Sequence, residues 1–143
     1  MDRLRKDLSL KGFANLVAKD LQKLRRMEEA NSDGICRCIS CGKRDHYKKM
    51  HGGHFIAGRS MSVLLVEDNI WPQCVSCNQH KHGNQVGFEQ GLIDKFGEVH
   101  GGLLVKYLRE LKKKTLTYTR ETLADLRDTY KVRIKIEEKR VGK

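Results

Sequence analysis

The chain has 143 residues, with 33% charged and 38% hydrophobic residues and a formal net charge of +11. This length corresponds to one domain with a modest core. The excess of Lys and Arg (29) over Asp and Glu (18) favours a polyanionic partner, above all nucleic acid, over a soluble basic surface without such a partner. The first twelve residues, "MDRLRKDLSLKG", are charged throughout, and no apolar run reaches the length of a membrane span, so we expect a cytoplasmic protein with neither a signal peptide nor a membrane anchor.

The first segment, residues 1–34, is expected to be helical over residues 3–30. Apolar residues recur there at three- and four-residue steps: Leu4, Leu8, Leu16, Val17, Leu21 and Leu24. Gly12 is a candidate break within this helix, and "NSDG" at residues 31–34 is a stop signal.

The central segment, residues 35–96, begins with a stretch rich in Cys, His and Gly. Its short apolar runs, "HFI", "SVLLV" and "NIW", indicate brief strands and loops. Cys38-x-x-Cys41, followed by Gly42, and Cys74-x-x-Cys77 each suit a tight turn that points two sulfurs at one ion. Because cytosolic thiols stay reduced and the total of five Cys is odd, a four-cysteine structural zinc site is predicted rather than disulfides.

Cys36 leaves an alternative open. It could replace Cys38 as a ligand, but it lies five residues before Cys41, which is a poor spacing for a tight turn, so we interpret it as a spare thiol. A thioredoxin-like redox role for the Cys pairs is the remaining alternative, and the absence of a βαβ pattern around them counts against it.

The C-terminal segment, residues 97–143, continues a helical pattern that begins near residue 84. Gly97, or the pair Gly101 and Gly102, is expected to divide it. The predicted buried stripe consists of Val86, Leu92, Ile93, Phe96, Val99, Leu103, Leu104, Tyr107, Leu108 and Leu111. The last stretch favours a helix, although Val132, Ile134 and Ile136 also alternate as in a strand.

Three polar residues in the central segment suit the hydrolysis of a phosphodiester. His54 is a candidate general base because a neutral imidazole titrates near neutral pH. Asn69 and Asn78 offer amide oxygens of the kind that hold Mg²⁺. Each has a plainer alternative: His54 a packed core residue, Asn69 a turn residue, and Asn78 a helix N-cap.

The strings "CISCG", "GGHFIAG", "EDNIWPQC" and "CVSCN" resemble the HNH (ββα-metal) nuclease pattern, with Asn in the third position. The wider string from residue 35 to 96 is similar to the phage NinG/Rap recombination proteins. The resemblance implies that His54 is the base, Asn69 orients it and Asn78 binds Mg²⁺. It also implies structure-selective cleavage of branched DNA, such as D-loops and Holliday junctions, by a phage protein in the cytoplasm of its bacterial host.

In the related endonuclease VII pattern, an acidic metal ligand directly precedes the catalytic histidine. This chain departs from the pattern because it has Gly53 at that position. The second Mg²⁺ ligand is therefore open. Candidates are His51, His54, His80, His82, Asp45, Glu67 and Asp68. Lys43, Arg59 and Lys81 lie closest to the motif and are the expected phosphate contacts.

Together these features predict an α+β protein with a zinc-bound ββα-metal (HNH) nuclease core flanked by N- and C-terminal helices. The expected partners are branched DNA, a second copy of the chain and possible recombination proteins, and the expected cofactors are Zn²⁺ and Mg²⁺. Paired cuts at a junction call for a dimer, with the apolar helices outside residues 35–83 as its interface. A non-catalytic zinc module that binds DNA and a sequence-specific homing-type nuclease are the alternatives.

Overall fold

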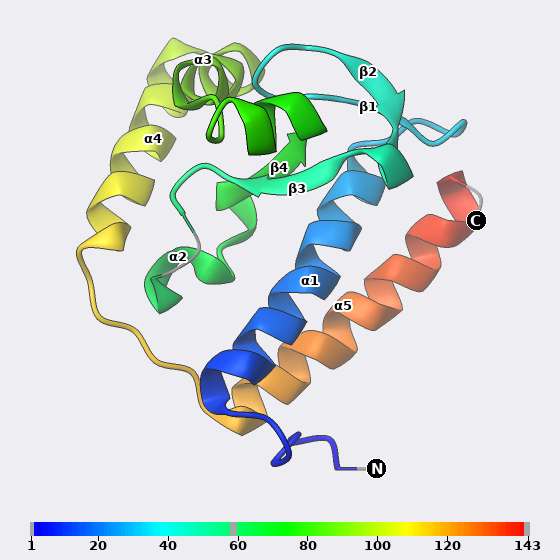
Figure 1. The fold of residues 1–143 in the computed structure, drawn as a ribbon, viewed down its shortest axis with the longest axis vertical. Helices are drawn as coiled ribbons and strands as arrows, with labels where there is room; N and C mark the ends of the chain where they lie inside the picture. Colours follow the sequence, from blue (N-terminus) through cyan, green and yellow to red (C-terminus); the bar gives the residue numbers. More distant parts are fainter. Residues whose placement is uncertain (1, 58–59, 142–143) are drawn as a thin grey trace.

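Two small antiparallel hairpins lie between long helices (Figure 1). The computed structural model describes residues 2–57 and 60–141. The helices are α1 (Leu10–Glu28), α2 (Met61–Leu64), α3 (Gln85–Phe96), α4 (Glu98–Lys112) and α5 (Arg120–Val141). The strands are β1 (Ile35–Arg37), β2 (Arg44–His46), β3 (His51–His54) and β4 (Ile70–Gln73), with short helical turns η1 (Tyr47–Lys49), η2 (Glu67–Asn69) and η3 (Ser76–His80, a π-helix). This mixed architecture confirms the expected α+β class, and none of the described helices is apolar enough over a sufficient length to cross a membrane.

Helix α1 is the main element of the larger core. It begins later than expected because Ser9 caps it: the Ser9 hydroxyl accepts a hydrogen bond from the Gly12 N–H at 2.9 Å. Gly12 therefore lies in the first turn of the helix, and the predicted break there is wrong. One face of α1 is fully buried through Phe13, Val17 and Leu21, as its helical spacing predicts.

The β3–β4 hairpin lies directly against α1. Its register pairs His51 with Gln73 and His54 with Ile70, so His54 is the last residue of β3. Gly52 permits the close approach, since a Cβ at that position would come within 2.6 Å of the Gln22 Cβ on α1. The hairpin thus carries the histidines to one side of α1.

Helices α3 and α4 cover a second, smaller core. They meet at Gly97, which has a φ of 88° and confirms the first of the two predicted break points. The buried residues of this core come from the loop after β3, from α2, β4, α3 and α4, and they are Phe55, Ile56, Val63, Trp71, Phe88, Leu92, Val105 and Leu108.

Helix α5 lies beside α1 and runs in the same direction (Figure 1). Three arginines attach it. Arg120 donates to the carbonyls of Leu4, Arg5 and Leu8 ahead of α1, and Arg140 donates to carbonyls at the end of α1. Arg133 bridges Glu28 and Glu67. The C-terminal helix expected from its apolar steps is confirmed, and the strand alternative is wrong.

Two further sequence predictions differ from the structure. The "SVLLV" run forms the short helix α2 and the turn after it rather than a strand, because its apolar side chains are shared between the two cores. The predicted buried stripe is wrong at five exposed residues: Val86 (86% exposed), Phe96 (36%), Val99 (72%), Leu103 (60%) and Tyr107 (55%). Helix α4 covers the small core through the narrow face of Val105 and Leu108, with Leu104 and Leu111 partly buried beside it, so Val99, Leu103 and Tyr107 are left exposed.

Candidate active site

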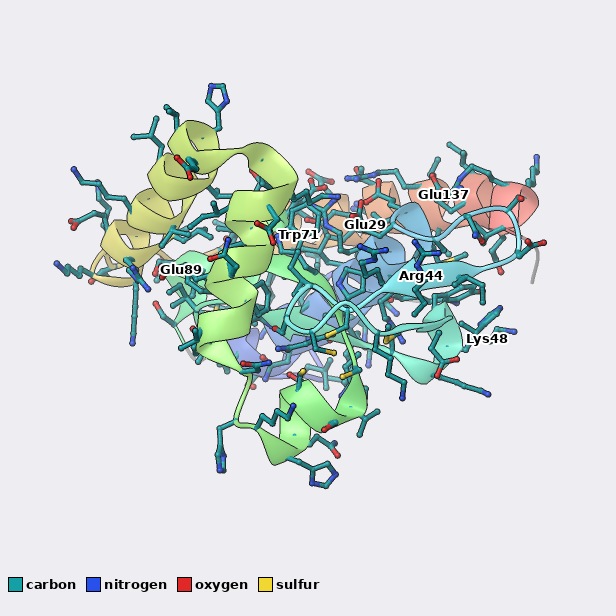
Figure 2. All side chains as sticks on the ribbon, turned by 90° about the horizontal axis from the view of Figure 1, so that it is seen from above. Glu29, Arg44, Lys48, Trp71, Glu89 and Glu137 are labelled. Atoms are coloured by element: carbon teal, nitrogen blue, oxygen red, sulfur yellow. The ribbon has the colours of Figure 1, made fainter. Side chains whose placement is uncertain are left out.

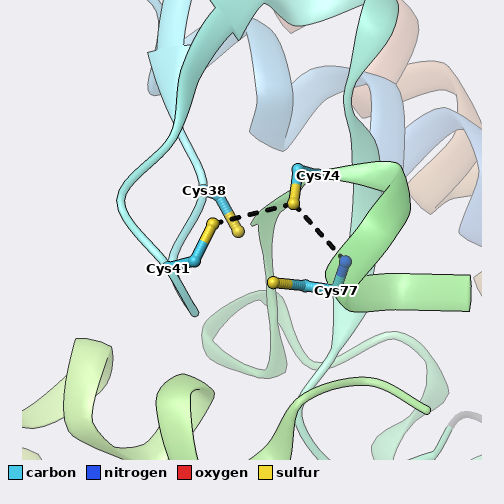
Figure 3. A group of neighbouring side chains, drawn as sticks. All are labelled: Cys38, Cys41, Cys74 and Cys77. Atoms are coloured by element: carbon cyan, nitrogen blue, oxygen red, sulfur yellow. Dashed lines mark hydrogen bonds between the residues drawn. The ribbon is translucent and has the colours of Figure 1, made fainter. Parts of the chain in front are cut away.

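Four cysteine sulfurs converge between the two hairpins. The Sγ atoms of Cys38, Cys41, Cys74 and Cys77 all lie within 4.8 Å of one another, and those of Cys41 and Cys74 are 3.7 Å apart (Figure 3). Tetrahedral zinc with bonds of about 2.3 Å places its sulfurs about 3.8 Å apart. The donor set and its spacing therefore fit a zinc ion, and four sulfurs would close its coordination shell.

The surrounding backbone supports these turns. Gly42 has a φ of 80° directly after Cys41, a left-handed conformation that glycine adopts without strain. On the second turn, the Cys77 N–H points at the Cys74 sulfur at 3.4 Å, and the Asn84 amide donates to the Cys77 sulfur at 3.3 Å. These donors would stabilise thiolate charge, which is the state that zinc requires.

Cys36 lies outside the sulfur cluster. It sits on β1 opposite Asp45 and is 3% exposed. Burial raises the pKa of its thiol to about 11, which keeps it protonated and unreactive. This placement agrees with its interpretation as a spare thiol.

His54 is held at the end of β3 by one backbone contact. Its Nε2 lies 3.1 Å from the Leu64 carbonyl oxygen on α2. A carbonyl oxygen only accepts hydrogen bonds, so Nε2 carries the ring proton and Nδ1 is the basic nitrogen of the neutral ring. Burial lowers the pKa of His54, partly opposed by this hydrogen bond. The neutral form, able to take up a proton, is therefore favoured.

Asn69 does not hydrogen-bond to His54 within the described residues. It is fully buried, its Oδ1 accepts from the Ile56 N–H at 2.8 Å, and its Nδ2 donates to the carbonyls of Ile56 and Val63 at 2.9 and 3.1 Å. These bonds connect Ile56, just after the end of β3 at His54, with Val63 on α2. Asn69 thus fixes the segment whose Leu64 carbonyl holds the His54 ring.

Replacing Asn69 with alanine is expected to lower the free energy of unfolding by about 3 kcal/mol, because buried backbone groups at Ile56 and Val63 lose their partner. Asn15→Ala is the matched control, since Asn15 is exposed on α1 and alanine favours a helix. Denaturant unfolding monitored by circular dichroism measures both. Equal stability of the two variants would contradict this role for Asn69.

Asn78 lies within η3 and faces the hairpin rather than capping a helix. Its side-chain Nδ2 is 2.8 Å from the Nδ1 of His51. Asn78 and His54 line one pocket of about 320 Å³. The remaining lining residues are Gln22, Gly52, Ala57, His82, Gly83 and Gln85. The structure thus brings the predicted base and the predicted metal ligand together.

All three acidic candidates for a second ligand are engaged elsewhere. Glu67 forms an ion pair with Arg133 at 2.8 Å, and Asp68 lies 3.8 Å from Arg25. Asp45 accepts a hydrogen bond from the His46 N–H. Among the described lining residues there is no carboxylate, so the donor set does not match the oxygen-rich shell that Mg²⁺ prefers.

Two residues at the site were not assigned a role from the sequence. Gln73 was not singled out, and His51 was only one of several candidates for the second metal ligand. Gln73 is fully buried and donates from Nε2 to the Ser40 hydroxyl at 2.9 Å and to the Gly83 carbonyl. It thereby links the first cysteine turn to the loop before α3. The two adjacent glycines at 52 and 53 were the available signal, because glycine within a strand marks a close approach by other groups.

Several exposed cations of the central segment form no ion pair within the part of the chain that the structure describes. Within residues 2–57 and 60–141, Lys43, Arg44, Lys48 and Lys81 are exposed and form no ion pair. Figure 2 shows Arg44 and Lys48 on the same side of the molecule, on β2 and the turn after it. Lys43 and Lys81 are thus available to phosphate, while the predicted contact Arg59 lies outside the described residues.

Comparisons with known proteins point to one family. A family model described as "Bacteriophage Lambda NinG protein" matches residues 2–140. "Protein ninG" of Escherichia phage 933W and that of Escherichia phage lambda are each 38% identical over 61 residues, 43% of this chain and 30% of theirs. "Protein ninG" of Salmonella phage P22 is 38% identical over 60 residues, 42% of this chain and 30% of its own. The matched segment therefore spans less than a third of these relatives. No solved structure shows significant similarity.

Proposed function

Since this chain belongs to the bacteriophage lambda NinG protein family, matched over residues 2–140, we propose that it is a structure-selective DNA endonuclease that cleaves branched recombination intermediates. The observation that supports the proposal is the shared pocket. His54, from the end of β3, and Asn78, from η3, line the same 320 Å³ cavity beside a sulfur cluster suited to zinc. A base next to a polar oxygen ligand is what phosphodiester hydrolysis by water requires.

His54 is the proposed general base. Its Nδ1 takes a proton from water while its Nε2–H remains bonded to the Leu64 carbonyl. Asn69 acts as a positioning residue through the loop that it ties together. Asn78 contributes to holding a divalent cation, which would neutralise the charge that develops on the phosphate. The exposed cations Lys43 and Lys81 attract the DNA backbone.

The experiment that tests this function is cleavage of a panel of DNA shapes. Four-way junctions of unrelated sequence, D-loops and linear duplexes are incubated with the full chain and a divalent cation. We expect cuts in the branched molecules regardless of sequence, leaving 5′-phosphate and 3′-hydroxyl ends. Cleavage confined to one linear sequence would indicate a homing-type nuclease. Binding without any cleavage would indicate a DNA-binding zinc module.

A junction has two-fold character, so we also propose a homodimer, with α4 as its interface. Val99, Leu103 and Tyr107 repeat at four-residue steps and remain exposed. Leu103→Asp is expected to halve the mass measured by light scattering, because it places a charge in that apolar row. Ile136→Asp on α5 is the control, since Leu103 and Ile136 are both 60% exposed. A monomeric wild type, with and without junction DNA, would contradict the dimer.

A further inference from the structure

Helix α5 carries a row of lysines along one side. Lys131, Lys135 and Lys139 recur at four-residue steps, and each of them is exposed. Within residues 2–57 and 60–141, none of the three forms an ion pair. Like charges at this spacing are neighbours on the surface of a helix and repel one another. The row therefore destabilises α5 unless an anion lies against it.

The cation on the other side of α5 is arranged differently. Arg133 follows Lys131 by two residues, which is about half a turn around the helix. It bridges Glu28 and Glu67, with 2.8 Å from its Nη2 to each carboxylate, and so attaches α5 to α1 and η2. The lysine row makes no such attachment among the described residues, so the stability of the fold does not explain it.

An ion pair between α5 and α1 shows where the row lies. Arg127 Nε is 3.5 Å from the Oδ2 of Asp20. Lys131 follows Arg127 by four residues, about one turn further along the same side of α5. Lys23, which is exposed, follows Asp20 by three residues on α1. Since the two helices lie side by side and run in the same direction, Lys23 and Lys131 belong to one surface (Figure 1).

This surface extends along α1 to the rim of the pocket that contains His54. Lys19 and Lys23 are exposed, lie four residues apart and form no ion pair in the part of the chain that the structure describes. Between them in the sequence is Gln22, which lines the pocket. The lysine surface consists of these two lysines and the row on α5: Lys19, Lys23, Lys131, Lys135 and Lys139.

The extent of the lysine surface suits duplex DNA. Packed helices lie about 8–10 Å apart, and the row on α5 rises about 12 Å from its first lysine to its last. Duplex DNA carries one negative charge per about 1.7 Å of its axis, so a surface of this size faces several phosphates at once. Lysine binds phosphate as a point charge and needs no fixed geometry. A continuous polyanion therefore relieves the repulsion on both helices.

We propose that the lysine surface holds a second duplex arm of a branched DNA substrate. The pocket lies between Gln22 of α1 and the loop of His82 and Gly83, so DNA at the pocket is bordered by α1 on one side. Helix α5 packs against α1 and contributes no residue to the pocket lining. DNA that has left the pocket across α1 therefore reaches the row on α5. The proposal relies on the nuclease function above for its biological role, and it assigns the preference for branched over linear DNA to this row.

The test measures DNA binding without a divalent cation, so that no DNA is cut. The zinc-loaded full chain and the triple variant Lys131→Gln, Lys135→Gln, Lys139→Gln are titrated with a four-way junction and with a linear duplex of one arm's sequence. The affinity of the variant for the junction should fall at least about tenfold, because three phosphate contacts are lost. The slope of log K against log salt concentration should become shallower by about 2 to 3. The affinity for the linear duplex should change by less than about twofold.

A matched control removes the same charge from the opposite side of the molecule, where α4 lies (Figure 1). Its three lysines are exposed and, within the described ranges, form no ion pair. The control is the triple variant Lys106→Gln, Lys112→Gln, Lys114→Gln. It should keep the wild-type preference for the junction. An equal loss of junction affinity in both triple variants would overturn the proposal, because net charge alone would then explain the binding.

Two further results would overturn the assignment. Equal losses on the junction and the linear duplex in the α5 variant would mean that the row does not bind a second arm. Unchanged junction affinity would mean that DNA does not contact the row, and an acidic protein would become the better partner, since Val132 and Ile136 beside the lysines are 59% and 60% exposed.

Failure of the nuclease proposal gives a different pattern. A junction preference that depends on the row, combined with no cleavage after a divalent cation is added, would refute the enzyme and support the DNA surface. Cleavage of branched DNA with an unchanged junction preference in the α5 variant would support the enzyme and refute the surface.

Discussion

Replacing His54 with alanine is expected to lower the rate of cleavage of branched DNA by about 10² to 10⁴-fold while DNA affinity stays close to that of the wild type. The imidazole is held by one bond from Nε2 to the Leu64 carbonyl, so Nδ1 is the basic nitrogen, and the residue lines the pocket. Removal of the ring takes away the proton acceptor and leaves the surface cations in place. Single-turnover cleavage and an equilibrium DNA-binding assay measure the two quantities separately.

The pH profile distinguishes a base from a residue that only supports the fold. Burial lowers the pKa of His54, so the ring is neutral at pH 7 and becomes protonated only on acidification below the ordinary histidine value of about 6.5. The wild-type rate should therefore be flat above neutral pH and fall in that acidic range. The residual rate of His54→Ala should lack this fall.

His100→Ala is the matched control for His54→Ala, because His100 is exposed on α4 and lies outside the pocket lining. Cleavage by His54→Ala at the rate of this control would contradict the role of His54 as the base. Loss of DNA binding together with cleavage in a folded His54→Ala would assign the ring to DNA contact instead.

Loss of zinc is expected to unfold the hairpin region. Structural zinc contributes on the order of 10 kcal/mol to the folding of small domains, which is comparable to the whole net stability of a typical protein. The sulfurs of Cys74 and Cys77 belong to the larger core, and Gln73 connects the same turns to the loop before α3. Without the metal, four thiolates would repel one another or bury unbonded thiols.

Cys74→Ser tests this expectation. It should bind less than one zinc per chain, lose thermal stability by tens of degrees and lose cleavage, because the loop that presents Asn78 and His82 begins at this turn. Cys36→Ala is the control. It removes a buried thiol outside the sulfur cluster, so zinc content should remain at one per chain. Elemental analysis and thermal melts provide the measurements. A wild type without zinc, or equal zinc loss in both variants, would contradict the assignment.

Local pattern was sufficient for much of the architecture. The two Cys-x-x-Cys pairs predicted the sulfur cluster because a two-residue gap sets the geometry of each turn within itself. Helical spacing predicted α1, the α3–α4 pair and α5, since the repeat of 3.6 residues is a property of the backbone.

Contacts between distant segments decided the remainder. Nothing near Asn69 in the sequence indicates that its amide holds Ile56 and Val63, or that His51 orients Asn78. Glu67 was a reasonable ligand candidate until α5 brought Arg133 to it.

Helical spacing likewise could not predict which apolar residues of α4 are buried. The spacing shows which residues share a face of the helix, but not how much of that face the neighbouring elements cover. Val99, Leu103 and Tyr107 are exposed for that reason. The spacing of residues along the chain thus determined the long helices and the two cysteine turns by itself. The partner of each polar side chain, and with it the donor set of the pocket, depended on which remote elements the fold placed against it.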